Sequence, residues 1–201
     1  HNMNYQHLFL KRQINIEGLY TFLYIENDKS FRSAGEKHNF WEFVYIDAGD
    51  ISAISDNTGY SLNQGDVIFH KPMSFHSHAA NHRKTNNILV VSFETQSPLM
   101  SFFADKIFTL NTRQKKLLSD FLEHTKTLFG TSFVHREEST EEFSPQQFIA
   151  YQVCISLLEL FLLELISDNT YTSKRDKQNP DAKKIVETAF SDHIKEFLAE
   201  N

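Results

Sequence analysis

The stretch GDVIFHKPMSFHSH, residues 65–78, contains two runs of strand-forming residues separated by a turn. The first run, VIFH, follows a Gly-Asp turn signal and ends at Pro72, because proline cannot continue a strand ladder. The second strand is expected from about Phe75 to Ala80. Within it His76 and His78 are two residues apart, so both side chains can point to the same face of a sheet.

Similar short runs of β-branched and aromatic residues lie on both sides of this stretch. Turn signals such as DNTG at 56–59 separate them. Six or more short strands at close spacing predict an antiparallel sandwich or barrel, which we assign to residues 1–95. The other expected strands are residues 8–14, 19–25, 40–46, 51–54, 60–62 and 88–93.

After about residue 95 the apolar residues recur with a helical period. A first helix is expected from Thr112, as its cap, to Phe129, and Gly130 should end it. Residues 131–143 are polar and charged and are expected to form a loop. The change of period predicts a mainly β domain followed by C-terminal helices.

A second helix is expected from Ser144-Pro145, with proline at the first helical position, to about Ile166. This helix, residues 145–166, is apolar nearly all round, whereas a helix that covers one side of a small barrel needs one apolar stripe. The surplus surface predicts burial against a second copy of the chain, so residues 96–167 are interpreted as a helical packing and dimerisation segment. In the alternative, the first helix and the barrel cover the whole surface.

The polar residues 168–181 are interpreted as a linker, in which the Lys/Arg group at 174–177 is solvated. An amphipathic helix follows in residues 182–201 and has no evident partner to pack on. We therefore expect it to belong to a further domain of a longer protein. Its apolar positions are Ile185, Ala189, Ile194, Phe197 and Leu198.

The composition describes a globular chain with an acidic surface. Of 201 residues, 40% are hydrophobic, 19 are Phe and one is Trp, and the formal net charge is −6. An acidic chain lacks the basic footprint of a DNA-binding surface. The single Cys154 lies in an apolar run and reads as a buried residue. One cysteine, no signal peptide and no unbroken run of 18 apolar residues predict a cytoplasmic protein without a membrane span.

A second cluster of chemistry-bearing residues surrounds Glu42. His38 and Glu42 share parity on one strand and can point to the inside of the barrel, where Phe40 should also lie. Trp41 and Tyr45 have the opposite parity and should pack beneath the helices. We therefore predict that His38, Phe40, Glu42, His76 and His78 line a ligand-binding site.

Three interpretations of this cluster remain open. His38, Glu42 and His76 could hold a divalent metal ion, since imidazole and carboxylate ligands suit Zn, Fe or Mn. The same groups could contact an organic effector, or simply hydrogen-bond to one another. We expect no cofactor, with a divalent metal ion at His38, Glu42 and His76 as the alternative.

Residues 35–49 and 65–78 resemble the two motif segments of the cupin superfamily. Glu42 and Gly49 have the spacing of the first segment, with His38 four residues before Glu42, and Gly65, Pro72 and His76 fit the second loosely. One histidine of the usual pair is missing from the first segment. The resemblance implies an antiparallel cupin-like β-barrel, that is, a double-stranded β-helix.

The stretch from about His38 to Phe103 more closely resembles the sensor domains of AraC-type bacterial transcription regulators, and the helices that follow complete the likeness. The resemblance implies a homodimer that binds a small metabolite, such as a sugar, inside the barrel and is not an enzyme. Residues 182–201 would open a helix-turn-helix domain through which alone the protein would bind DNA. Residues 3–14 would be either a ligand-gated arm or an edge strand. The alternative is a metal-dependent cupin enzyme, an isomerase or dioxygenase.

Overall fold

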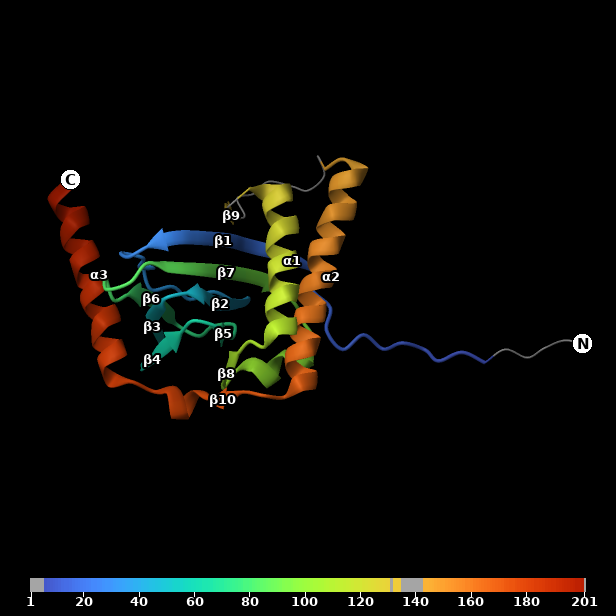
Figure 1. Ribbon diagram of the computed structural model, residues 1–201, viewed down its shortest axis with the longest axis horizontal. Helices are drawn as coiled ribbons and strands as arrows, with labels where there is room; N and C mark the ends of the chain where they lie inside the picture. The colour runs from blue at the N-terminus through green and yellow to red at the C-terminus, as the bar shows by residue number, and fades with distance from the viewer. Residues whose placement is uncertain (1–5, 131, 135–142, 201) are drawn as a thin grey trace, which may run out of the picture.

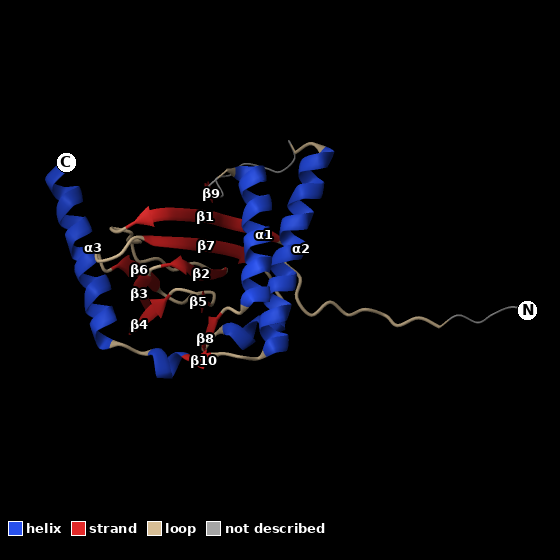
Figure 2. Cartoon of the chain, viewed as in Figure 1, coloured by secondary structure: helices blue, strands red, loops and turns tan. Residues whose placement is uncertain are grey.

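Two antiparallel sheets lie between a pair of helices on one side and a single long helix on the other (Figure 1). The computed structural model describes residues 6–130, 132–134 and 143–200. The larger sheet has the strand order β10-β8-β5-β2-β7-β1-β9, and the smaller has the order β4-β3-β6. The chain is thus mainly antiparallel β with helices in its C-terminal half, as the sequence predicts (Figure 2).

The strands of the N-terminal half fall close to the predicted runs. They are β1 Gly18–Asp28, β2 Trp41–Ala48, β3 Asp50–Ser55, β4 Thr58–Asn63, β5 Asp66–His70, β6 His76–Ala80 and β7 Asn86–Glu94. The later strands, β8 Lys106–Thr109, β9 Ser132–Val134 and β10 Thr172–Ser173, are short, and the sequence analysis did not predict them. β9 lies where a loop was expected, and residues 135–142 of that loop lie outside the described residues.

The alternation along β2 divides the core in two, as parity predicts. Trp41, Phe43 and Tyr45 face the helices, in one cluster with residues of α2. Val44 and Ile46 face the other way, into a second cluster between the two sheets. Because both faces of β2 are covered, the strand is buried from residue 41 to residue 46.

Helices α1 Thr112–Phe129 and α2 Pro145–Asp168 cover the outer face of the large sheet (Figure 1). α2 begins as predicted, since the Ser144 side chain accepts from the backbone N–H of Gln147 in a capping box. α1 is capped by Asn111 and not by Thr112, because the Asn111 side chain accepts the hydrogen bond from the backbone N–H of Gln114. Gly130 ends α1 as expected.

Within the described residues, α2 is the one helix that is long and apolar enough to cross a membrane by length and composition. Its inner face is nevertheless occupied by the protein itself. Cys154, Leu158, Phe161 and Leu165 are buried, and Phe161 contacts Phe43 of β2 with a ring-centroid distance of 5.7 Å. α2 is therefore a core helix of this domain.

The expected strand at residues 8–14 is absent. Leu8, Phe9 and Leu10 are exposed in an extended segment that leaves the domain beside α2 (Figure 1). β1 pairs with β7 on one side and, over residues 21–23, with β9 on the other, and residues 6–14 pair with no strand. Within residues 6–14 the edge-strand alternative is wrong, while residues 3–5 lie outside the described residues.

The segment between α2 and the last helix was predicted to be solvated, and this is wrong at two lysines. β10 pairs with β8, and the following short helix η3 Lys174–Lys177 lies on the large sheet. Lys174 is only 9% exposed and its Nζ donates to the backbone oxygen of Phe69 at 2.8 Å. Lys177 forms an ion pair with Asp66 at 3.2 Å. The long lysine side chains let a polar segment reach carbonyl and carboxylate oxygens beneath it.

The last helix, α3 Pro180–Glu200, also has a partner, contrary to expectation. Ala182 and Val186 are buried against the small sheet, where Val186 packs with Ile54 and Ala79. Four of the apolar positions singled out in the sequence lie on the exposed side of α3: Ile185, Ile194, Phe197 and Leu198. The helix therefore docks with a narrow face of small residues.

Replacing Lys174 by methionine should change how stability depends on pH. Burial, the largest influence, lowers the pKa of Lys174 to about 8, whereas a lysine in an unfolded chain titrates near pH ~10.4. Between these values the unfolded chain binds more protons, so the wild-type free energy of unfolding rises with pH through this window. The stability advantage of Lys174→Met should be largest below pH 8 and shrink towards pH ~10.4, as measured by denaturant titration. Lys184 is exposed on α3, so the free energy of unfolding of Lys184→Met should depend on pH as that of the wild type does. An equal dependence on pH in Lys174→Met and Lys184→Met would contradict the expectation.

Candidate functional site

Four side chains from three segments meet at one end of the space between the sheets. Glu42 lies on β2 and points inward, and His76 is the first residue of β6 in the opposite sheet. Glu36 and His38 precede β2, and Glu36 is held beside His76 by two backbone hydrogen bonds of 3.0 Å. One ligand atom from each of the four residues lies within 4.8 Å of the others. The structure thus brings together His38, Glu42 and His76, the three residues that the sequence analysis offered as metal ligands.

The two histidines have the same fixed orientation. His38 Nδ1 lies 3.1 Å from the backbone oxygen of Phe40, and His76 Nδ1 lies 3.0 Å from that of Ser74. A carbonyl oxygen can only accept, so each Nδ1 carries a hydrogen and donates it. In the neutral rings each Nε2 therefore carries a lone pair, and these lone pairs approach Glu42 oxygens at 3.5 Å and 3.2 Å.

Neither of these contacts has hydrogen-bond geometry. Of the residues that the structure describes, four have a buried side-chain nitrogen or oxygen without a hydrogen-bond partner, namely His38, His70, His76 and Ser92. His38 and His76 contact Glu42, and His70 and Ser92 are its register partners on β5 and β7. The unsatisfied groups are therefore all neighbours of one carboxylate, which is the environment expected where an ion or ligand supplies the missing partner.

The donor set fits a divalent transition-metal ion. Two imidazole lone pairs and two carboxylates converge, and a cation would satisfy acceptors that otherwise face one another. The hydrogen bonds from Nδ1 to backbone carbonyls are the outer contacts that orient histidine ligands. Glu36, whose side chain is half exposed, is the member of the cluster nearest to solvent.

The carboxylate and the imidazole of the central pair shift each other's pKa in opposite directions. Burial, the largest influence, raises the pKa of Glu42, but the interactions with His38 and His76 outweigh it and lower the pKa to about 2. Burial lowers the pKa of His76, and the contact with Glu42 outweighs this and raises it above 6.5. Burial and the charge of Glu42 raise the pKa of Glu36. The cluster therefore favours a negative charge on Glu42.

Phe40 and His78, the other predicted site residues, lie beside the cluster. Phe40 stacks on His38 with a centroid distance of 3.8 Å and on Tyr20 at 4.0 Å. It therefore supports the ring of His38 and is not part of the inward-facing row on β2. His78 Nε2 lies 3.0 Å from His70 Nε2, and burial lowers the pKa of His78 to about 4, so this pair is held neutral behind the cluster.

The sequence analysis missed the contributions of Glu36 and His70. Glu36 has the same parity as His38 and Glu42, and this signal could have found it. His70 stacks on His76 at 4.4 Å and stands opposite Glu42 in the β2–β5 register. That register is a long-range pairing without a local signal in the sequence.

No family model and no curated protein matches the sequence. A predicted oxalate decarboxylase from Thermotoga maritima is similar in structure, with 20% identity over 36% of this chain and 64% of its own, and a TM-score of 0.34. A cupin superfamily protein from Desulfitobacterium hafniense is 12% identical over 39% of this chain and 70% of its own, with a TM-score of 0.33. Apo ToxT from Vibrio cholerae is 10% identical over 77% of this chain and 57% of its own, with a TM-score of 0.47. The chain spans less than two thirds of the length of the first and the third.

Glu42→Gln should lower the pKa of His76 in the metal-free protein. The charge that raises this pKa is removed while the burial that lowers it remains, so the value should fall below 6.5. Titration of the imidazole carbon-bound protons by NMR measures the change. Glu36→Gln is the matched control and should lower the pKa less, because Glu36 is a smaller influence on His76. An unchanged His76 pKa in Glu42→Gln would contradict the assignment.

The same pair predicts a pH window for stability. The depressed pKa of Glu42 contributes stability above pH 4.5 that is lost as pH falls towards 2, and the raised pKa of His76 contributes stability below pH 6.5 that is lost as pH rises through its folded value. Glu42→Gln should therefore lower the free energy of unfolding most between pH 4.5 and pH 6.5.

Proposed function

We propose that the chain is the sensing and dimerisation part of a bacterial transcription regulator of the AraC type, and that a divalent transition-metal ion takes part in sensing. One observation carries the proposed metal site: among the described residues, the buried polar atoms without partners belong to His38 and His76, which contact Glu42, and to His70 and Ser92, which stand opposite it in the strand register. A group arranged in this way has donors and lone pairs ready for a bound species. The resemblance of residues 38–103 to the sensor domains supports the regulatory role.

Glu36, His38, Glu42 and His76 would hold the ion. Two imidazoles and carboxylate oxygens suit Zn²⁺, Fe²⁺ or Mn²⁺. When bound, the ion would supply a Lewis acid that attracts oxygen atoms of a small metabolite such as a sugar. The chain's own residues orient the ligands through the carbonyls of Phe40 and Ser74.

The position of the cluster supports a sensing role because both helical layers lie one residue away from it. Phe43 follows Glu42 on β2 and packs on Phe161 of α2. Ser77 follows His76 on β6 and faces α3. A small displacement of either strand would reach α2 or α3 directly, and a coupling of about 1–3 kcal/mol changes affinity by about 5–150-fold.

Metal binding is the first test. Untagged, chelator-treated protein should bind about one Zn²⁺ or Co²⁺ per chain in isothermal titration calorimetry, and His76→Ala or Glu42→Gln should weaken binding by about tenfold or more. Binding should also weaken as pH falls below the raised pKa of His76, since a protonated imidazole cannot coordinate. His124→Ala, exposed on α1, is the control. Equal affinities in all variants would refute the site.

A second candidate function is a metal-dependent cupin enzyme. The observation that favours it is the donor set, since two histidines and a carboxylate also form the facial triad of non-haem iron oxygenases. Substrate-dependent oxygen uptake or sugar isomerisation by the metal-loaded protein would support the enzyme. The sensor instead predicts metal-dependent changes in α3 or in dimer affinity without turnover.

The dimer would form through the outer face of α2. Ile149, Leu160 and Leu163 are exposed along one line of this helix, with Val153 and Leu157 partly exposed beside it. A second copy related by a two-fold axis would cover the same residues on both chains. This surface is the surplus apolar face that the sequence predicts.

Leu160→Lys should convert the dimer to a monomer. A charge placed in the centre of an apolar self-association face cannot be buried without cost. Sedimentation or light scattering at tens of micromolar is the measurement, and Leu198→Lys, more exposed and on α3, is the control. A wild-type protein that is already monomeric at this concentration would contradict the proposed dimer.

A further inference from the structure

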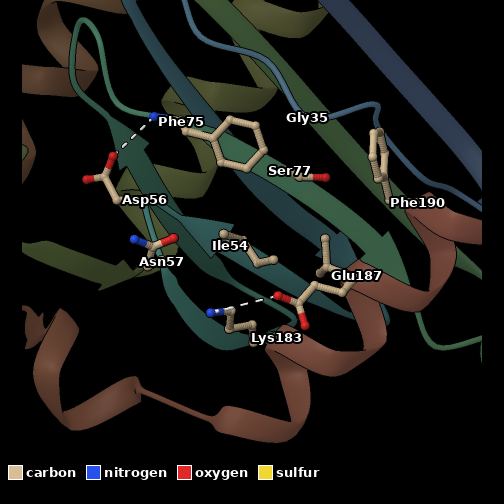
Figure 3. Close-up of a pocket in the computed structure, with 10 residues that line it drawn as sticks. Gly35, Ile54, Asp56, Asn57, Phe75, Ser77, Lys183, Glu187 and Phe190 are labelled. Atoms are coloured by element: carbon tan, nitrogen blue, oxygen red, sulfur yellow. Dashed lines mark hydrogen bonds and ion pairs between the residues drawn. The ribbon is translucent and has the colours of Figure 1, made fainter.

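A cavity of about 220 Å³ lies between α3 and the outer face of the small sheet (Figure 3). Phe75, Ile54, Val186 and Phe190 contribute its apolar walls, two from the sheet side and two from α3. A single-ring molecule is of a suitable size for such a cavity, which is smaller than a drug-sized site. The cavity involves the same face of α3 that docks on the sheet.

The cavity is separate from the Glu42 cluster. Phe75 and Ser77 line the cavity, whereas His76 between them points into the space between the sheets and contacts Glu42. Successive side chains alternate across the sheet, so the two sites lie on opposite faces of β6. A ligand in the cavity would therefore touch neither imidazole of the cluster.

The position of Phe75 depends on the glycine opposite it. A Cβ added to Gly35 would lie 2.2 Å from Cζ of Phe75, so the ring lies directly against the backbone of the β1–β2 connection. The backbone N–H of Phe75 donates to the Asp56 carboxylate at 3.2 Å. One wall of the cavity is thus an aromatic ring with a carboxylate beside it.

The charges around the cavity favour a cation. Asp56 and Glu187 contribute two carboxylates, and Lys183 contributes one ammonium group (Figure 3). Lys183 lies 3.8 Å from Glu187, one turn along α3, and offsets that charge. Asp56 is exposed and accepts from the neutral N–H of Phe75 at the cavity, while the charge of Lys174, which is outside the lining, also acts on it. The lining therefore carries an excess negative charge next to two phenyl rings, which attract cations through their faces.

We propose that this cavity binds a small organic cation with one aromatic ring, the ring against Phe75 and Phe190 and the ammonium group towards Asp56. Such a ligand would contact the small sheet and α3 at once. It would add to the contacts that hold α3 in place, which include the burial of Ala182 and Val186 and the ion pair between Arg32 and Glu196. Occupancy would thereby stabilise the docked position of α3.

The test uses 2-phenylethylamine as the cationic probe and phenylacetate as the matched anion, on the full chain in the presence of a chelator. Because no metal is present, the outcome is independent of the function proposed for the Glu42 cluster. The amine should shift the backbone amide NMR signals of Gly35, Ser77 and Val186 in a saturable way. It should also slow hydrogen exchange along α3, and phenylacetate should do neither.

Asp56→Asn is the decisive variant. Asn tolerates the positive φ of 53° at this position and keeps an oxygen that can accept from Phe75, while the charge is removed. Affinity for the amine should fall about fivefold. Glu187→Gln tests the second carboxylate, and Asp192→Asn, exposed on α3 outside the cavity, should leave the affinity unchanged.

Three results would overturn the proposal. The first is no shift of the lining amides at millimolar amine, and the second is equal binding of phenylacetate, which would indicate an anion site centred on Lys183. The third is an Asp56→Asn variant that is folded by its NMR spectrum and binds the amine as tightly as the wild type.

Discussion

The burial of one ionised carboxylate constrains the centre of this molecule. Glu42 is only 4% exposed, in the middle strand of the large sheet. A charge in such a position is tolerated only with close polar partners. His38 Nε2 and His76 Nε2 approach its oxygens at 3.5 Å and 3.2 Å without hydrogen-bond geometry, and each ring is oriented by a backbone carbonyl two residues away. The carbonyls are fixed in turn because the connection before β2 pairs with β6. The cluster around one carboxylate thus draws side chains of both sheets together at this end.

The strand alternation transmits this arrangement outward. On β2, the residues that flank Glu42 are Trp41 and Phe43, which lie in the core beneath α1 and α2. On either side of His76, Phe75 just before β6 and Ser77 on β6 line the cavity under α3. The polar site therefore has no layer of intervening residues between itself and either helical layer. Close-packed layers transmit displacements and do not absorb them. This property would suit the proposed site, which is to control the surrounding helices.

The parts of the structure that follow local rules could be predicted from the sequence. Parity predicted the correct face for Trp41, Glu42 and Tyr45, and Ser144-Pro145 predicted the start of α2. The failures are long-range. Residues 8–14 have the composition of a strand but pair with no strand of either sheet, and Lys174 belongs to a polar segment whose burial depends on the carbonyl of Phe69. Glu36 enters the site only because its backbone pairs with His76.

The shallow attachment of α3 fits the output role that the proposed sensing function would require of it. Of its 21 residues only Ala182 and Val186 are buried, and burying one valine-sized side chain contributes about 1.5–3 kcal/mol. The ion pair of Arg32 with Glu196 is exposed on the helix side and adds little. The contribution of that one side chain is therefore of the same order as the 1–3 kcal/mol that ligands typically couple between sites. A ligand of this strength could not move a helix that was attached more deeply. Without the cavity beneath α3, a ligand would have no contact that distinguishes the docked from the undocked helix. Both conditions hold at the outer face of β6, directly behind His76.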